Sequence, residues 1–153
     1  MPSTDPSPLT AFDASAKARL LRQAAASAPL WIVARGDSMG KSIPTGSSVL
    51  VAKYSTPRRG QVWAYCDQSG GVVVHRYRRH RDVGHVLQGD TRTHPDSPVH
   101  DGLLIGRVTA VRRGDRVRSV GWSDSCLAEG RRLRRALVAR ASRVTRRLRR
   151  VDR

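Results

Sequence analysis

The feature that most constrains the fold is a series of seven short apolar or alternating runs between residues 31 and 120. Each run is four to eight residues long, and clusters of Gly, Pro, Asp and Ser separate one run from the next. Runs of this length and composition predict β-strands. Seven of them at this spacing favour a mainly β domain, built as an antiparallel barrel or a folded antiparallel sheet. The predicted strands are 31–34, 49–53, 61–65, 72–77, 85–88, 104–111 and 116–120.

The residues before the strands differ in composition. Residues 1–9 are rich in Pro and Ser, which predicts a disordered lead. Asp13 can cap a helix within residues 10–28, and Pro29 ends it. The folded domain is therefore expected over residues 29–122. The apolar stripe of the helix is predicted at Leu20, Leu21 and Ala24.

The C-terminal segment carries most of the charge. The formal net charge is +17, and residues 131–153 contain eleven Arg and one Asp. Apolar residues recur there at steps of four and three, which predicts a basic amphipathic C-terminal helix over residues 123–153. Such a helix is typical of binding to an anionic membrane surface, and packing on the domain with solvated arginines is the alternative. Nucleic acid is not the expected partner.

The cysteines, the apolar runs and the N-terminal aspartates bear on the cellular compartment of the protein. Cys66 and Cys126 lie far apart and lack metal-ligand spacing, which favours free thiols in a cytosolic protein. No run approaches the roughly 20 apolar residues of a membrane-spanning helix. Asp5 and Asp13 interrupt the basic leader that a secretory signal would need. We expect a cytoplasmic location, peripheral at the inner face of the cell membrane if the tail binds lipid.

Three polar segments could form a catalytic site. Ser38 lies in a glycine-entered bend between the first two predicted strands, and His75 follows the apolar run 72–74. Asp90 and Asp96 lie six residues apart in one turn. A hydroxyl nucleophile, a histidine, which ordinarily titrates near neutral pH, and an orienting carboxylate make a complete hydrolase set.

Each of these residues also has an ordinary structural explanation. Ser38 could lie in a plain polar loop, His75 could be a simple strand histidine, and the aspartates could be turn formers. His94 is a rival base, and a zinc site from His75, His94 and Asp96 is conceivable. The remaining histidines are expected at the surface. Four arginines could bind acidic groups, although a solvated strand edge is favoured: Arg76, Arg78, Arg79 and Arg81.

The segments follow an order that resembles a known family. Five segments of the chain resemble the ordered boxes of the type I signal peptidases. In chain order, they are GDSM with Ile43 and Gly46, PRRGQVW, VVVHRY, GDxxxxxD and Gly106-Arg107-Val108. That family shares its all-β catalytic fold with the LexA-type self-cleaving repressors. The resemblance covers about residues 31–111, and it implies a serine endopeptidase of signal-peptidase-like fold.

The third box indicates the branch of the family. His75 stands where bacterial signal peptidases and the repressors usually carry lysine, which resembles the endoplasmic-reticulum and archaeal type. The resemblance implies that Ser38 is the nucleophile, His75 the general base and Asp96 the orienting carboxylate, with Asp90 as a structural or auxiliary carboxylate. Neither a cofactor nor a metal is expected.

The chain also departs from the family pattern. Its departures, which bear on substrate fit, are Lys41 for the usual proline, Ser47 for an acidic residue, Gln61 for aspartate and Thr91 for asparagine. Gly36 and Met39 are the expected substrate contacts.

The sequence thus predicts an endopeptidase that cleaves a precursor or signal/leader peptide. One alternative is a dedicated maturation protease for one neighbouring peptide. Another is a non-catalytic or self-cleaving regulator that binds DNA or membrane, although the roughly 30 residues before the first strand are too few for a helix-turn-helix domain.

Overall fold

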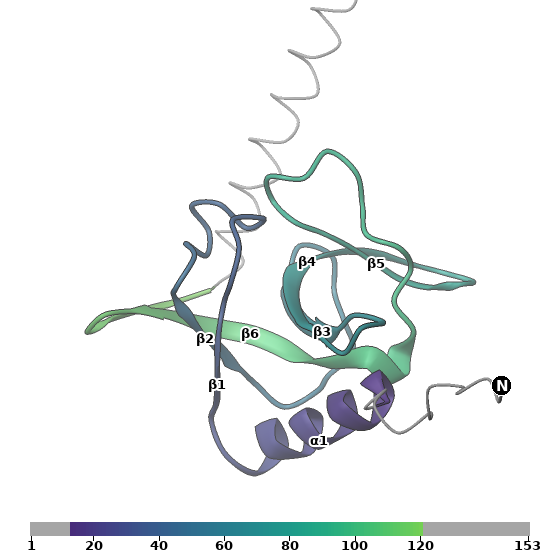
Figure 1. Ribbon diagram of the computed structural model, residues 1–153, viewed down its shortest axis with the longest axis horizontal. Coiled ribbons are helices and arrows are strands. Elements are labelled where there is room, and N and C mark those ends of the chain that lie inside the picture. Colours follow the sequence, from purple (N-terminus) through teal and green to yellow (C-terminus); the bar gives the residue numbers. More distant parts are fainter. Residues whose placement is uncertain (1–12, 121–153) are drawn as a thin grey trace, which may run out of the picture.

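The computed structural model describes residues 13–120 (Figure 1). In this part of the chain, seven strands form one antiparallel sheet in the order β1-β2-β6-β3-β4-β5, with β7 paired to β6. The predicted mainly β fold is confirmed, and the sheet is folded rather than closed into a barrel. The elements are α1 (Ala14–Ser27), β1 (Leu30–Val33), β2 (Ser48–Val51), β3 (Val62–Cys66), β4 (Val72–Arg81), β5 (Gly84–Gln88), the 3-10 helix η1 (Asp101–Leu103), β6 (Leu104–Arg113) and β7 (Arg116–Ser119).

Strand β6 joins the two halves of the sheet. Its first half pairs with β3, and its second half pairs with β2 and β7. Register shifts at Leu50/Val51 and Ala64/Tyr65 mark bulges, which bend strands and increase their twist. Gly106 lies at the junction, where an added Cβ would come within 2.2 Å of the Ala52 carbonyl oxygen. Only glycine therefore allows the two halves to approach so closely.

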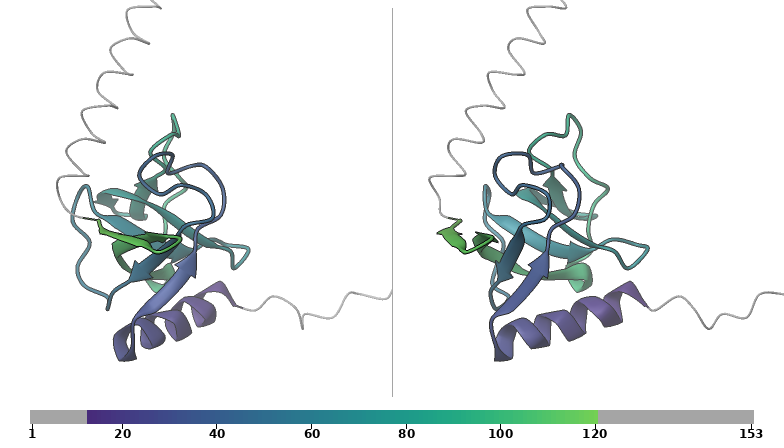
Figure 2. Two further views of the ribbon diagram at one scale, coloured as in Figure 1. Left: turned by 90° about the vertical axis from the view of Figure 1, so that its left-hand side faces the viewer. Right: turned by 60° about the vertical axis from the view of Figure 1, so that its left-hand side comes forward.

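Helix α1 covers one side of the sheet (Figure 2). The Asp13 side chain accepts a hydrogen bond from the Ser15 N–H at 3.0 Å, as expected of an N-cap. The predicted apolar stripe was partly wrong, because Leu20 is 57% exposed and the buried residues are Ala18 and Ala25. Small alanines let the helix backbone approach the sheet, and the partly buried Leu21 packs against the same core cluster.

Arg22 fastens the helix to the start of β6. Its Nε donates to the Leu104 carbonyl at 2.9 Å, and its Nη2 donates to the Asp101 carbonyl at 2.6 Å. The guanidinium also lies 4.3 Å from the centre of the Tyr54 ring. These contacts fix the helix on the far side of the sheet from the two loops that carry the candidate site (Figure 1).

Strand β4 runs four residues past its predicted end, to Arg81. The extension pairs with β5 up to Arg81 opposite Gly84, and the register shifts at Arg78. The last three of these residues are exposed and all four are polar, so the sequence lacks the apolar alternation that would reveal a strand. Gly84 has φ +127°, and an added Cβ would meet the Val99 carbonyl oxygen at 2.7 Å, so glycine is required there.

Several predictions concern residues outside the described part of the chain. These are the lead at 1–9 and the basic helix at 123–153, together with its expected membrane partner. Among residues 13–120, no helix is long and apolar enough to cross a membrane. Cys66 is buried and carries a free thiol.

Candidate active site

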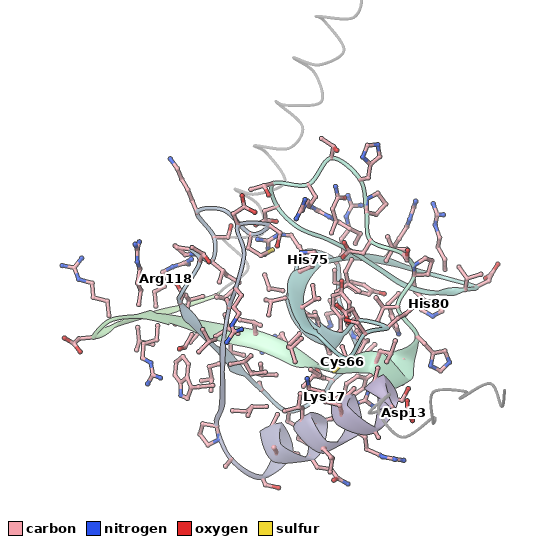
Figure 3. All side chains as sticks on the ribbon, viewed as in Figure 1. Asp13, Lys17, Cys66, His75, His80 and Arg118 are labelled. Atoms are coloured by element: carbon pink, nitrogen blue, oxygen red, sulfur yellow. The ribbon has the colours of Figure 1, made fainter. Side chains whose placement is uncertain are left out.

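Three predicted residues meet in one hydrogen-bonded row. The Ser38 Oγ lies 2.8 Å from His75 Nε2, and His75 Nδ1 lies 2.6 Å from Asp96 Oδ2. They come from the loop after β1, from β4 and from the loop after β5, and Figure 3 marks His75 on its strand. Because a carboxylate only accepts, Nδ1 donates to Asp96, and Nε2 is left to accept the hydroxyl proton of Ser38.

Glycines allow the two loops to touch at the serine. The Thr91 N–H and Oγ1 both donate to the Ser38 carbonyl, at 2.9 and 3.1 Å. An added Cβ at Gly89 would lie 2.7 Å from that carbonyl oxygen, and one at Gly40 would lie 2.8 Å from the Thr91 Cγ2. Thr91, a departure from the family pattern, thus holds the backbone of the serine in place.

A tyrosine supports the aspartate. The Tyr65 hydroxyl donates to Asp96 Oδ2 at 3.0 Å, and the Asp96 N–H donates to the Leu87 carbonyl at 2.9 Å. Burial, together with the negative charge of Asp96, raises the pKa of Tyr65 well above its usual value. Tyr65 therefore remains a protonated donor at physiological pH, and Asp96 is oriented by a tyrosine as well as by the backbone.

Asp90 has a different set of partners. Arg76 donates two hydrogen bonds to Asp90, from Nε at 2.8 Å and from Nη2 at 2.7 Å. The Ser42 hydroxyl also donates to Asp90, at 2.7 Å. Burial alone would raise the pKa of Asp90, but the hydrogen bonds and charge of Arg76 outweigh this and hold the pKa below its usual value. Asp90 thus ties the serine loop to β4 and does not bond His75.

The prediction of a solvated strand edge at Arg76 was wrong. Its side chain is fully buried, and its third hydrogen bond goes from Nη1 to the Gly60 carbonyl at 2.7 Å. Strand alternation explains the placement, because neighbours on a strand point to opposite faces. His75 faces the serine, and Arg76 faces the other side, where the charge of Asp90 compensates it.

A groove runs along the candidate site. It encloses about 270 Å³ and is lined by the end of β1, the first residues of β4 and the serine loop. Among the described strands, β1 pairs only with β2, and residues 72–75 of β4 pair only with β3. The groove is therefore flanked by two unpaired strand edges. Both predicted substrate contacts line it: Gly36 is exposed there, whereas Met39 is 4% exposed and also belongs to the core.

The other histidines do not join the row. His94 is exposed, and its Nδ1 lies 2.9 Å from the Thr93 hydroxyl rather than near Ser38. His80 lies on the exposed part of the β4–β5 hairpin (Figure 3). The prediction of a surface position was wrong for His85, which is 7% exposed and lies 3.4 Å from Asp101. Among residues 13–120, no group of His, Cys, Asp or Glu is arranged to hold a metal ion.

The sequence analysis did not find the role of Tyr65 beside Asp96. It also did not find the hydrogen bond from Ser42 to Asp90 or the hydrogen bonds that Gln61 accepts in the turn before β3. Trp63 pairs directly with His75, so Tyr65, two residues further along β3, must lie on the same face as His75. The alternation becomes a usable signal only once the pairing of Trp63 with His75 is known. Gln61, a departure from the family pattern, accepts from the Arg58 N–H at 2.9 Å and the Trp63 Nε1–H at 3.1 Å, so it closes the turn before β3.

A row of Ser, His and Asp side chains linked by hydrogen bonds is the side-chain arrangement that serine hydrolases use on several unrelated folds. The chain belongs to the Peptidase S24-like family, whose sequence profile matches residues 11–109, more than half of the chain. The predicted resemblance is confirmed at this level, that of the LexA- and signal-peptidase-like proteins. The family is generally one of serine peptidases and self-cleaving regulators. Comparison with curated proteins gives no match.

Proposed function

We propose that the protein is a serine endopeptidase that cleaves a precursor or leader peptide through Ser38, His75 and Asp96. The observation that supports this most is the Ser38 Oγ to His75 Nε2 distance of 2.8 Å, in a row completed by Asp96 at 2.6 Å. A serine hydroxyl becomes an effective nucleophile when an adjacent base can take its proton. The histidine in turn needs a carboxylate to fix its tautomer and to stabilise its charged form.

The steps follow from these atoms. Ser38 Oγ attacks the peptide carbonyl carbon while His75 Nε2 takes the hydroxyl proton, and a tetrahedral oxyanion forms. The C–N bond then breaks, and His75 gives the proton to the leaving amine. Water, deprotonated by His75, releases the acyl group and restores Ser38. The Ser38 N–H has no acceptor within the described part of the chain, and it is the donor that we assign to the oxyanion.

The groove supports an extended substrate. Its walls are the free edges of β1 and of residues 72–75 of β4. A peptide laid between them can hydrogen-bond as an added strand, with alternate side chains facing the groove. Binding would then rely on the peptide backbone.

The test has a readout that needs no substrate. A fluorophosphonate probe should label Ser38 of the wild type, and mass spectrometry should locate the label on that residue. His75→Ala should slow labelling at least about a thousandfold, as expected when the base is lost. The matched controls are Ser55→Ala and His94→Ala, which change exposed residues outside the row and should react like the wild type.

The same variants are then used with a panel of precursor peptides. Cleavage by the wild type and both controls, with loss in Ser38→Ala and His75→Ala, is the expected result. Labelling or cleavage that persists in Ser38→Ala would remove Ser38 as the nucleophile. Circular dichroism of each variant must match the wild type, so that lost activity reports chemistry rather than unfolding.

A self-cleaving regulator is the second candidate, because the family includes such proteins. Incubation of the full-length chain should then give two fragments at a rate independent of protein concentration, and Ser38→Ala should abolish them. A chain that stays intact while it cleaves added peptides in trans supports the endopeptidase instead. Retention on DNA with a steep salt dependence would favour a DNA-binding regulator.

A further inference from the structure

Strands β1, β2, β6 and β7 share a face that points away from the core. Residues that pair directly in an antiparallel sheet, and residues two apart on one strand, lie on the same face. The core takes the other face of these strands, where Val49 and Val111 belong to one cluster with Ala18 of helix α1. Two cross-strand rows therefore make up the outer face: Val33, Ser48, Arg112 and Val117 in the first, and Trp31, Leu50, Ala110 and Ser119 in the second.

The outer face is largely apolar and is open to solvent within the described part of the chain. Val33 and Val117, at the two ends of the first row, are 58% and 57% exposed. Trp31, Leu50 and Ala110 of the second row are half-buried. Single exposed apolar residues are ordinary, but these are neighbours in register and form one patch, which is typical of an interaction site.

Arginines accompany the apolar residues of the outer face. The guanidinium carbon of Arg112 lies 4.5 Å from the centre of the Trp31 ring, so the indole carries a positive charge above it. The end of the β6–β7 hairpin extends beyond Ser48, the first residue of β2 (Figure 1). In this extension Arg113 pairs directly with Arg116, and both are exposed.

The pairing of Arg113 with Arg116 points to an anionic partner. Like charges directly opposite each other destabilise a strand pair. Asp115 is the only acidic residue between Leu104 and Ser119, so the sequence supplies little compensation within the hairpin. Anionic groups bound at the hairpin would remove the repulsion.

We propose that the outer face and the β6–β7 hairpin bind the surface of an anionic lipid bilayer. The apolar side chains enter the boundary between headgroups and acyl chains, a region that favours tryptophan, and the arginines bind lipid phosphates. In sequence, the positive charge continues after β7, with eleven Arg and one Asp in residues 131–153. Nucleic acid could also neutralise the arginines, but it offers no partner for the apolar rows between them.

Binding is measured by co-sedimentation of the full-length protein with vesicles. Vesicles of phosphatidylcholine that contain about a third phosphatidylserine should bind at least about tenfold more tightly than pure phosphatidylcholine vesicles. Arg113→Gln/Arg116→Gln should weaken binding to the anionic vesicles about tenfold, because each arginine near the surface contributes attraction. Val33→Asn/Val117→Asn should weaken it about fivefold, through loss of apolar burial.

Matched controls separate the outer face from the rest of the basic chain. Arg79→Gln/Arg81→Gln changes two exposed arginines of β4 and gives the same net charge as the hairpin variant. Leu20→Gln/Val83→Asn changes two apolar residues that are 57% and 70% exposed elsewhere. Both controls should bind within about twofold of the wild type once circular dichroism shows that all variants are folded. If the face variants and the controls bind alike, the inference is wrong.

The insertion of Trp31 has a readout of its own. In a Trp122→Phe background, phosphatidylserine with brominated acyl chains should quench tryptophan fluorescence, because Trp63 is fully buried and Trp31 lies on the outer face. Replacement of Trp31 by Phe in that background should abolish the quenching. Fluorescence that stays unquenched with Trp31 present would overturn the inference.

A DNA duplex tests the other class of anionic partner. If a duplex displaces the protein from anionic vesicles, and the face variants lose duplex binding as strongly as vesicle binding, the outer face binds nucleic acid and the inference is wrong. The inference does not depend on the proposed function. Vesicle binding by a chain whose Ser38 resists the fluorophosphonate probe would remove the endopeptidase and leave the membrane-binding face.

Discussion

Replacement of Asp90 by asparagine tests how much the buried ion pair contributes to stability. Arg76 is fully buried, so Asp90→Asn leaves its charge without a compensating carboxylate. Removal of one partner from a buried pair costs about 3–5 kcal/mol. The lower end applies here, because the Gly60 carbonyl still accepts from Arg76 and an asparagine oxygen can still accept once. At about 4 °C per kcal/mol for a domain of roughly 110 residues, a loss of about 3 kcal/mol lowers Tm by about 12 °C.

The assay is urea unfolding at pH 7, followed by tryptophan fluorescence. The matched control is Asp115→Asn, at an exposed turn, which should change stability by less than about 0.5 kcal/mol. The double variant Arg76→Met/Asp90→Leu should recover part of the loss, because it leaves no unpaired charge. If the unfolding free energy of Asp90→Asn stays within about 1 kcal/mol of the wild-type value, the buried Arg76–Asp90 pair does not stabilise the fold as inferred.

The pH dependence gives the same reasoning a second check. The pKa of Asp90 is lower in the folded state than its usual 3.8. Its ionised form therefore stabilises the fold above that value, and the contribution is lost as pH falls through the folded-state pKa. The difference in unfolding free energy between wild type and Asp90→Asn should be flat from about pH 5 to 8 and should narrow below about pH 4. A difference that grew on acidification would contradict the sign.

Two further predictions concern the contacts that support the Ser38-His75-Asp96 row. Gly89→Ala should destabilise the protein by about 1–3 kcal/mol and lower kcat, because the new Cβ would lie 2.7 Å from a backbone oxygen. Gly102→Ala is the control, because the nearest atom to its Cβ lies 3.4 Å away. Urea unfolding and peptide cleavage should show only a small effect of Gly102→Ala. Tyr65→Phe removes one hydrogen bond to Asp96 and should lower kcat about fivefold, or roughly 1 kcal/mol, with KM unchanged. Tyr54→Phe, which loses a hydroxyl outside the row, should leave kcat unchanged, and an equal drop in both variants would contradict a role for Tyr65.

The strands could be predicted from sequence because short apolar runs and turn residues mark them directly. Their pairing order could not. Every residue of β3 is buried, so the strand shows no alternation that would assign its faces or neighbours. The buried face of α1 could not be predicted either. Hydrophobicity alone favours Leu20 as a buried residue, whereas the residues that pack on the sheet are the small Ala18 and Ala25.

The candidate site was predictable in composition, but its connectivity came only from the family resemblance. Residue chemistry pointed to Ser38, His75 and a carboxylate, and the order of the boxes assigned Asp96 to the histidine. Asp90 and Asp96 share one loop, however, and spacing alone does not say which of them reaches the histidine. The contacts separate them, with Asp96 on His75 and Asp90 on Arg76. A charged strand residue such as Arg76 gives no sequence sign of burial until its partner is known.

The position of β6 in the chain has a consequence for biosynthesis. The β1–β2 pair and the β3–β4–β5 meander are each complete before residue 100, but both dock on β6, which begins at Leu104. A nascent chain therefore exposes the edges of two unfinished sheets until that strand leaves the ribosome, at about 5–20 residues per second. We expect the domain to fold in one late step, and a nascent chain that stalls just before Leu104 to be a chaperone client and a protease target.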